Sequence, residues 1–217
     1  MAEIGNVATN TPVEDQRTRS AMTFLSGIFS SKVRASVLVF LVTRSDGRFS
    51  LTELARALGL PVSSLQHECY KLERLNIIKG QREGLSRRYR ILTEEPTTAA
   101  MVHLVVSALG IQHATELALS DLEGVSGAMV VDAATHTGGD KLAYLVLVGD
   151  NDLEHLNVAH ARVATILGIP PDALESAFFA ENEWAVRAQT EKPMLQFVQS
   201  MPPIAVTGEL EATGAHT

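Results

Sequence analysis

The segment 50–92 constrains the fold more than any other part of the chain, because it contains closely spaced start and stop signals for short elements. Ser50 and Glu53 match a capping box, in which the serine hydroxyl and the glutamate carboxylate satisfy backbone donors at a helix start. Gly59 is the typical C-terminal stop of such a helix, and Pro61 follows it in a tight turn. The sequence therefore predicts a short helix that ends in a tight turn.

A second helix is predicted after that turn, because four apolar residues recur at spacings of four, three and three. Leu65, Cys69, Leu72 and Leu75 then form one apolar stripe, in which Cys69 is a small core residue. The opposite face carries polar side chains that can hydrogen-bond base edges or phosphates, namely Ser63, Gln66, His67, Tyr70 and Arg74.

A basic hairpin is predicted after this helix. The apolar and β-branched residues of 77–79 and 89–92 flank a loop, 80–88, that contains two glycines and three arginines. Upstream, Ser31 can cap a buried helix that runs to about residue 44, where Asp46 and Gly47 end it in a turn.

The charge of the chain is unevenly distributed. A net charge of −7 by itself argues against a nucleic-acid partner, because binding to a polyanion relies on Lys and Arg. However, residues 1–119 hold 14 basic and 11 acidic side chains, whereas residues 120–217 hold 4 and 14. Segment 44–90 alone holds 10 basic against 5 acidic side chains. The distribution favours DNA binding by the first half, and the acidic half is expected to restrain non-specific binding.

This order of elements resembles the winged helix-turn-helix of ArsR-type bacterial and archaeal regulators. The resemblance covers residues 21–92, and it is carried by the run LTELARALGLPVSSLQHECYKLERLNIIKGQREGLSRRYRIL. It implies that the helix at 63–75 enters the major groove and that the hairpin at 79–90 touches the flanking DNA backbone. The chain lacks the paired cysteines and clustered His and Asp of metal-sensing members, so no metal site is expected.

These considerations assign eleven residues to a DNA interface. Base-side contacts are expected from Ser63, Ser64, Gln66, His67, Tyr70 and Arg74, and contacts to the DNA backbone from Lys71, Arg82, Arg87, Arg88 and Arg90. The alternative for each of them is a solvated surface residue that contacts no ligand.

The segments around the winged helix are predicted from composition. Residues 1–20 are polar and lack the apolar region of a secretory signal, so a flexible arm is expected there. Residues 93–119 are predicted to form one connecting helix that packs against the second domain, a second subunit, or both. Residues 210–217 are expected to be a flexible tail. No apolar run is long enough for a membrane span, so a cytoplasmic protein without a membrane partner is expected.

Residues 120–209 are predicted to form a mixed α/β domain. Apolar, β-branched runs at 127–132 and 142–150 predict strands, and a helix is expected from Asp152 to Leu167, with Leu153, Leu156, Val163 and Leu167 on its inner face. A strand at 177–179, helices at 183–190 and 193–199, and a strand at 204–206 complete the pattern. The whole chain therefore belongs to the α+β class.

The acidic domain resembles the minimal nucleotidyltransferase fold. The resemblance is carried by the runs LVLVGD at 145–150 and FAENEW at 179–184, by Arg187, and by PIAVTG at 203–208. Active members have a Gly-Ser pair after the first strand and an Asp-x-Asp pair that binds two divalent cations. Here Asp132 and Ala133 stand near the first position, and Leu142, Ala143 and Tyr144 occupy the second. The resemblance therefore implies a domain without catalysis and without a cofactor.

The sequence predicts a homodimeric, sequence-specific DNA-binding transcriptional regulator, whose partners are double-stranded DNA and a possible small-molecule or nucleotide ligand of the second domain. Dimerisation is expected because one winged helix offers only a small base-contacting surface. Two alternatives stay open. One is a divergent nucleotidyltransferase with Asp132, Asp140 or Asp150 as replacement metal ligands, and the other is an interaction module whose helix-turn-helix docks a protein.

Overall fold

The computed structural model describes residues 12–132, 142–150, 152–187 and 203–208. The strands in these ranges form two sheets, one of three strands in the N-terminal half and one of four strands in the C-terminal half.

Three helices and the small sheet form a winged helix-turn-helix. The helices are α2 (Lys32–Thr43), α3 (Leu51–Leu58) and α4 (Val62–Arg74). Ser31 caps α2, because its hydroxyl accepts a hydrogen bond from the Arg34 N–H at 3.2 Å. The capping box of Ser50 and Glu53 is present at the start of α3, and Gly59 ends that helix in the left-handed conformation with a φ of +63°. These local predictions are confirmed.

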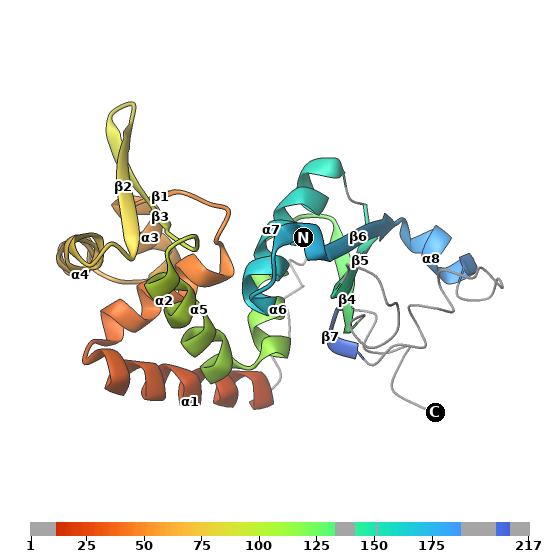
Figure 1. Ribbon diagram of the computed structural model, residues 1–217, viewed down its shortest axis with the longest axis horizontal. Helices are drawn as coiled ribbons and strands as arrows, with labels where there is room; N and C mark the ends of the chain where they lie inside the picture. The colour runs from red at the N-terminus through yellow and green to blue at the C-terminus, as the bar shows by residue number, and fades with distance from the viewer. Residues whose placement is uncertain (1–11, 133–141, 151, 188–202, 209–217) are drawn as a thin grey trace, which may run out of the picture.

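The hairpin is confirmed, but its strands are longer than predicted. Strands β2 (Ile78–Glu83) and β3 (Ser86–Ile91) pair in antiparallel register along their whole length, and the short β1 (Phe49–Ser50) pairs with β3 on the other side. The predicted loop at 80–88 is therefore wrong, and only Gly84 and Leu85 lie between the strands. Gly84 permits this tight turn because it has a φ of +60°. Figure 1 shows the hairpin projecting away from the rest of the molecule.

The C-terminal half is a four-stranded mixed sheet with helices. Its elements are β4 (Val125–Asp132), β5 (Ala143–Gly149), α7 (Leu153–Leu167), the short 3-10 helix η1 (Pro171–Ala173), β6 (Leu174–Phe179), α8 (Glu181–Arg187) and β7 (Pro203–Gly208). The strand order is β6-β5-β4-β7, with β5 and β6 parallel and the other pairs antiparallel. Asp152 caps α7 and Gly168 ends it with a φ of +66°, as predicted. The predicted helix at 193–199 and the tail at 210–217 lie outside the described residues.

Two predictions about the flanking helices are wrong. Helix α1 (Pro12–Phe29) begins inside the segment 1–20 that was expected to be a flexible arm, while residues 1–11 lie outside the described residues. Ala21 and Leu25 of α1 are buried in the core, so packing against the winged helix stabilises a segment with weak helical signals of its own.

The predicted connecting helix at 93–119 is two helices, α5 (Pro96–Leu109) and α6 (Ile111–Leu119), bent by 101°. Gly110 breaks the helix because it adopts a φ of +81°, which residues with a side chain rarely adopt. The bend lets α5 pack against α1 and α2, while α6 packs against α7 and β7. In Figure 1, α6 and α7 lie between the winged helix and the four-stranded sheet.

Each half has its own buried apolar core. The N-terminal core includes Leu38, Leu41, Leu54, Leu65, Cys69 and Leu72, and the main core of the second half includes Leu145, Leu147 and Val163. Two residues of the predicted apolar stripes are instead exposed, Leu75 at 63% and Leu153 at 66%. Leu75 is the C-cap of α4 and Leu153 is the first residue of α7, so each lies where a helical face no longer meets the core.

A buried arginine joins the two halves. Arg162 on α7 is only 5% exposed, and it makes ion pairs to Asp46, in the turn after α2, at 2.5 Å and to Asp121, after α6, at 2.6 Å. Its Nη1 also donates to the Ala118 carbonyl at 2.6 Å. Arg44 adds a second ion pair to Asp121 at 3.2 Å. The turn that leads into the helix-turn-helix is thus anchored to the second domain.

A side-chain amide makes a further contact between the halves. Gln112 on α6 donates to the Val206 carbonyl, and its Oε1 accepts from the Val206 N–H at 2.9 Å. The amide group thereby satisfies both polar backbone groups of a residue on strand β7.

Within the described ranges, no single helix is both long and apolar enough to cross a membrane, although two sharply bent helix pairs pass the same test of length and composition together.

Glu68 is a buried acid inside the winged helix. It accepts hydrogen bonds from Arg34 Nε at 2.8 Å and from Lys71 Nζ at 3.1 Å. Burial raises the pKa of Glu68, but the hydrogen bonds from Lys71 and Arg34 outweigh burial and hold this pKa below its usual value of 4.5. The charged form of Glu68 therefore stabilises the fold.

Replacing Glu68 by glutamine is expected to lower the free energy of unfolding at neutral pH by about 2 kcal/mol, because two charge-assisted hydrogen bonds are weakened. The folded-state pKa is depressed, so the contribution is complete above the usual value of 4.5 and is lost as the pH falls through the folded-state pKa. Urea unfolding of the parent and E68Q from neutral pH down to about pH 3 tests this. The difference between their free energies of unfolding should become smaller as the pH falls, and a difference that stays constant would contradict the prediction.

Candidate nucleic-acid interface

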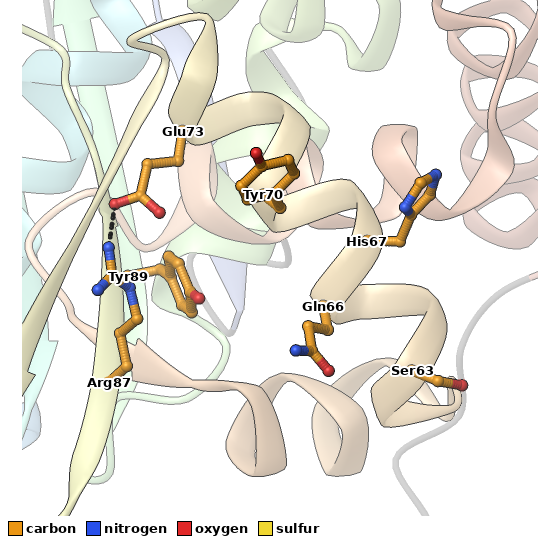
Figure 2. Close-up of a pocket in the computed structure, with 7 residues that line it drawn as sticks. All are labelled: Ser63, Gln66, His67, Tyr70, Glu73, Arg87 and Tyr89. Atoms are coloured by element: carbon orange, nitrogen blue, oxygen red, sulfur yellow. Dashed lines mark hydrogen bonds and ion pairs between the residues drawn. The ribbon is translucent and has the colours of Figure 1, made fainter.

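A hollow of about 580 Å³ lies between the outer face of α4 and strand β3. Its lining residues, all drawn in Figure 2, are Ser63, Gln66, His67, Tyr70, Glu73, Arg87 and Tyr89. Five of these were predicted as interface residues from the sequence, and Glu73 and Tyr89 were not. The remaining predicted residues, Ser64, Lys71, Arg74, Arg82, Arg88 and Arg90, do not line the hollow.

The helical side of the hollow follows from the period of α4. Gln66, Tyr70 and Glu73 are spaced by four and three residues, so they lie along one stripe of the helix. Figure 2 shows the Gln66 amide and the Glu73 carboxylate on the side of the helix that faces the strand, whereas the His67 ring points away from it. Gln66 and Tyr70 are exposed, which leaves their polar groups accessible to a ligand.

The strand side of the hollow follows from the hairpin register. Arg87 and Tyr89 lie on the face of β3 that is turned toward α4, and Arg82 shares that face because it pairs directly with Arg87. Arg88 and Arg90 alternate with them and point to the opposite face. The arginines of the hairpin therefore form two sets, and only Arg87 lines the hollow.

The second set of arginines is engaged in contacts within the protein. Arg88 makes an ion pair to Glu53 at 2.8 Å and donates to the Arg48 carbonyl at 2.8 Å, so it ties the hairpin to the start of α3. Arg90 makes an ion pair to Glu94 at 2.7 Å. Partly exposed pairs of this kind contribute little to the stability of the fold.

The predicted residues on α4 outside the hollow differ in their surroundings. Lys71 donates to the buried Glu68, as described above, and Ser64 is half-buried. Arg74 is exposed, and its guanidinium lies 5.9 Å from the centre of the Tyr70 ring, within the range of a cation–π contact. Arg82 is exposed at the end of the hairpin, where its Nε donates to the Gly84 carbonyl at 3.4 Å.

Glu73 connects the two sides of the hollow. Its Oε1 accepts from Arg87 Nη2 at 2.5 Å and from the Gly80 N–H at 3.0 Å. A Cβ at Gly80 would lie 2.5 Å from Arg87 Nε and 2.9 Å from Glu73 Oε1, so any other residue here would displace the ends of these two side chains. The hydrogen bond that Arg87 donates to Glu73 raises the pKa of Arg87. The half-exposed guanidinium lies 5.9 Å from the centre of the buried Tyr89 ring.

A sequence signal for Glu73 was present. Glu73 lies three residues after Tyr70, which is the spacing that places two side chains on one helical face. The residues predicted to contact DNA do not include Glu73, although its carboxylate lies on the same surface.

Asp132 and Asp150, two of the acids considered as replacement metal ligands, lie too far apart to bind one metal ion. Asp132 pairs with Ala143 at one end of β5, whereas Asp150 follows Gly149 at the other end. Seven strand residues separate these ends, a distance of about 20 Å. Ligands of one Mg²⁺ ion all lie at about 2 Å from it, so Asp132 and Asp150 cannot share an ion. Asp140 lies outside the described residues.

Comparison with known proteins gives no close relative. The chain matches no protein-family model, and no curated protein is similar to it. Solved structures similar to its N-terminal part include reduced HlyU from Vibrio cholerae N16961, with 21% identity and a TM-score of 0.32, over 43% of this chain and 95% of that chain. The transcriptional repressor BigR from Xylella fastidiosa has 23% identity and a TM-score of 0.32, over 45% and 91%. The reduced form of MarR from E. coli has 17% identity and a TM-score of 0.36, over 56% and 89%.

Proposed function

We propose that the protein is a DNA-binding transcriptional regulator, in which α4 enters the major groove and the hairpin of β2 and β3 contacts the adjacent sugar–phosphate backbone. The single observation that carries the proposal is the hollow between α4 and β3, because groups of two kinds face it. Gln66 and Tyr70 supply donors and acceptors that suit base edges, and Arg87 supplies a cation for phosphate.

The dimensions of the two elements support this arrangement. The major groove of B-DNA is about 12 Å wide and admits one α-helix, and α4 presents an exposed polar face over its length. A helix in the groove brings the neighbouring hairpin to the phosphates that border it. Arg82 and Arg87 share the hairpin face next to α4, so these two arginines are the proposed phosphate contacts.

Selection from random duplexes, followed by fluorescence anisotropy at several salt concentrations, tests the proposal. A regulator should enrich one sequence, and the logarithm of its association constant should fall linearly with the logarithm of salt concentration, by about 0.9 per neutralised phosphate. Enrichment of no sequence would contradict sequence-specific binding. An electrophoretic shift with the upstream region of its own gene separates DNA binding from the alternative, docking of a protein by the helix-turn-helix.

We propose that the regulator is a homodimer joined through α1. Phe24 and Ile28 lie one helical turn apart on α1 and are 51% and 55% exposed, so they form an apolar face on this helix. In Figure 1, α1 lies at the opposite end of the winged helix from the hairpin. A second copy would cover this face, and a two-fold dimer presents two copies of α4 for the two half-sites of an operator.

Replacing Phe24 and Ile28 by glutamate is expected to convert the dimer into a monomer, because burial of two like-charged pairs opposes association. Light scattering coupled to size exclusion measures the mass. Leu85 at the hairpin tip is 99% exposed and provides a matched control, since L85E adds a charge to another exposed apolar residue and should leave the mass unchanged. A parent that is already monomeric at micromolar concentration would contradict this interface.

For the C-terminal domain we propose a non-catalytic nucleotidyltransferase-like fold with a sensing or dimerisation role. The proposal is supported by the residues at the start of β5, where Leu142 and Tyr144 stand at the two positions that hold the metal-binding acids of Asp-x-Asp in active nucleotidyltransferases. Incubation with labelled nucleoside triphosphates and Mg²⁺ tests it, because transfer that depends on Asp132 and Asp140 would establish the enzyme instead. A thermal-shift screen with nucleotides tests sensing, since a ligand at about 100 times its dissociation constant stabilises a fold by about 2.7 kcal/mol.

A further inference from the structure

We infer that Glu73 limits the affinity of the interface for DNA by competing with phosphate for Arg87. The inference rests on the proposed function, because it assigns a role to one residue within the same site.

Glu73 and a bound phosphate would both accept hydrogen bonds from the guanidinium of Arg87. Arg87 Nη2 lies 2.5 Å from Glu73 Oε1, and the same oxygen accepts from the Gly80 N–H, so the carboxylate is fixed by two donors from the hairpin. The Arg87 side chain is 53% exposed, whereas that of Glu73 is 28% exposed. The guanidinium is therefore accessible from solvent while it is held by the carboxylate.

The hollow carries no net charge in this state. Among its seven lining residues, Glu73 is the only acid and Arg87 the only side chain that is always cationic. A phosphate that binds Arg87 must displace or share the carboxylate, and it then faces an anion across a few ångströms. Each phosphate contact therefore carries a cost that is absent when Glu73 is neutral.

A structural role for Glu73 predicts a different result. If the carboxylate served only to anchor the hairpin, its amide analogue would keep the Gly80 N–H bond and leave DNA binding unchanged or weaker. If Glu73 competes with phosphate, the same variant releases Arg87 and strengthens binding. Glutamine keeps the acceptor oxygen and removes the charge, so it separates these two roles.

The experiment is a double-mutant cycle with the full-length protein and one duplex, measured by fluorescence anisotropy against salt. E73Q is expected to tighten binding by about threefold to tenfold at low salt and to steepen the salt dependence by about 0.9, equivalent to one more neutralised phosphate. In the R87A background the same substitution should give a smaller gain and no change of slope, because no arginine is released. E73A should shift the affinity in the same direction as E73Q.

Glu94 provides a matched control. It also makes an ion pair to a hairpin arginine, Arg90, but on the opposite face of the hairpin, so E94Q makes the same change of net charge away from the hollow. Equal gains for E73Q with and without Arg87, or equal gains for E73Q and E94Q, would overturn the inference and leave the proposed function intact. A parent that binds no duplex would overturn the proposed function and this inference with it.

Discussion

Replacement of both Gln66 and Tyr70 by alanine is expected to weaken binding to the preferred duplex by about 30-fold to 1,000-fold, with little effect on a scrambled duplex. A bidentate contact to a base edge, such as Gln66 can make, contributes about 1–3 kcal/mol of discrimination, and the single hydroxyl of Tyr70 contributes about 1 kcal/mol, so the loss of both costs about 2–4 kcal/mol. Both side chains are exposed on α4, and neither belongs to the buried core. Competition anisotropy with the two duplexes measures the specificity ratio directly.

Asn157 provides the control for this experiment, because it is exposed on α7 of the second domain. N157A should leave both affinities unchanged. Should the double variant lose affinity equally for the preferred and the scrambled duplex, Gln66 and Tyr70 would contact the backbone rather than the bases. The assignment of α4 to the major groove would then be wrong.

Replacing Arg162 by alanine is expected to lower the free energy of unfolding by about 3 kcal/mol, which is the largest effect that we expect from any ion pair among the described residues. The truncation removes the three hydrogen bonds that Arg162 donates to Asp46, Asp121 and the Ala118 carbonyl. It leaves the two carboxylates without the cation that both of them contact. Loss of one member of a buried charge cluster costs about 3–5 kcal/mol, and the lower end applies here because both acids are partly exposed. Urea unfolding measures the change.

Arg44 is the matched control for Arg162. It makes an ion pair to Asp121 but does not reach Asp46, so R44A is expected to cost about 1 kcal/mol. R162A should also separate the unfolding of the two halves, because each has its own apolar core. A loss below about 1 kcal/mol, with one cooperative transition, would mean that apolar packing between α6 and α7 holds the halves together instead.

The features predicted correctly from the sequence are those that depend on neighbouring residues. The capping box of Ser50 and Glu53, the left-handed Gly59 and the ends of α7 are all decided within one helical turn. The polar face of α4 was predictable for the same reason, because a helix of known start and period fixes which side chains point outward.

Apart from the local breaks at Gly84 and Gly110, the features that were missed depend on residues distant in the sequence. Helix α1 extends back to Pro12 because Ala21 and Leu25 pack in a core built from other elements. The partners of Arg87 and Arg88 are acids 14 and 35 positions away, and strand alternation divides the hairpin arginines into two sets only once the register is known. No sequence pattern shows which acid on another element pairs with a given arginine. The sequence therefore counts Arg87, Arg88 and Arg90 as positive charges available to DNA, whereas in the structure each is paired with an acid.

The amide of Gln112 affects whether another copy of this protein can pair with the edge of the four-stranded sheet. Strand β7 lies at the border of its sheet, and such a border offers unpaired N–H and C=O groups to any extended peptide. At Val206 the N–H and the C=O both hydrogen-bond to the amide of Gln112 on α6, as they would to the backbone of one residue on a neighbouring strand. A strand from another copy would have to displace the Gln112 side chain before it could pair with β7 along its whole length. The side chain therefore protects the middle of this edge strand against edge-to-edge aggregation.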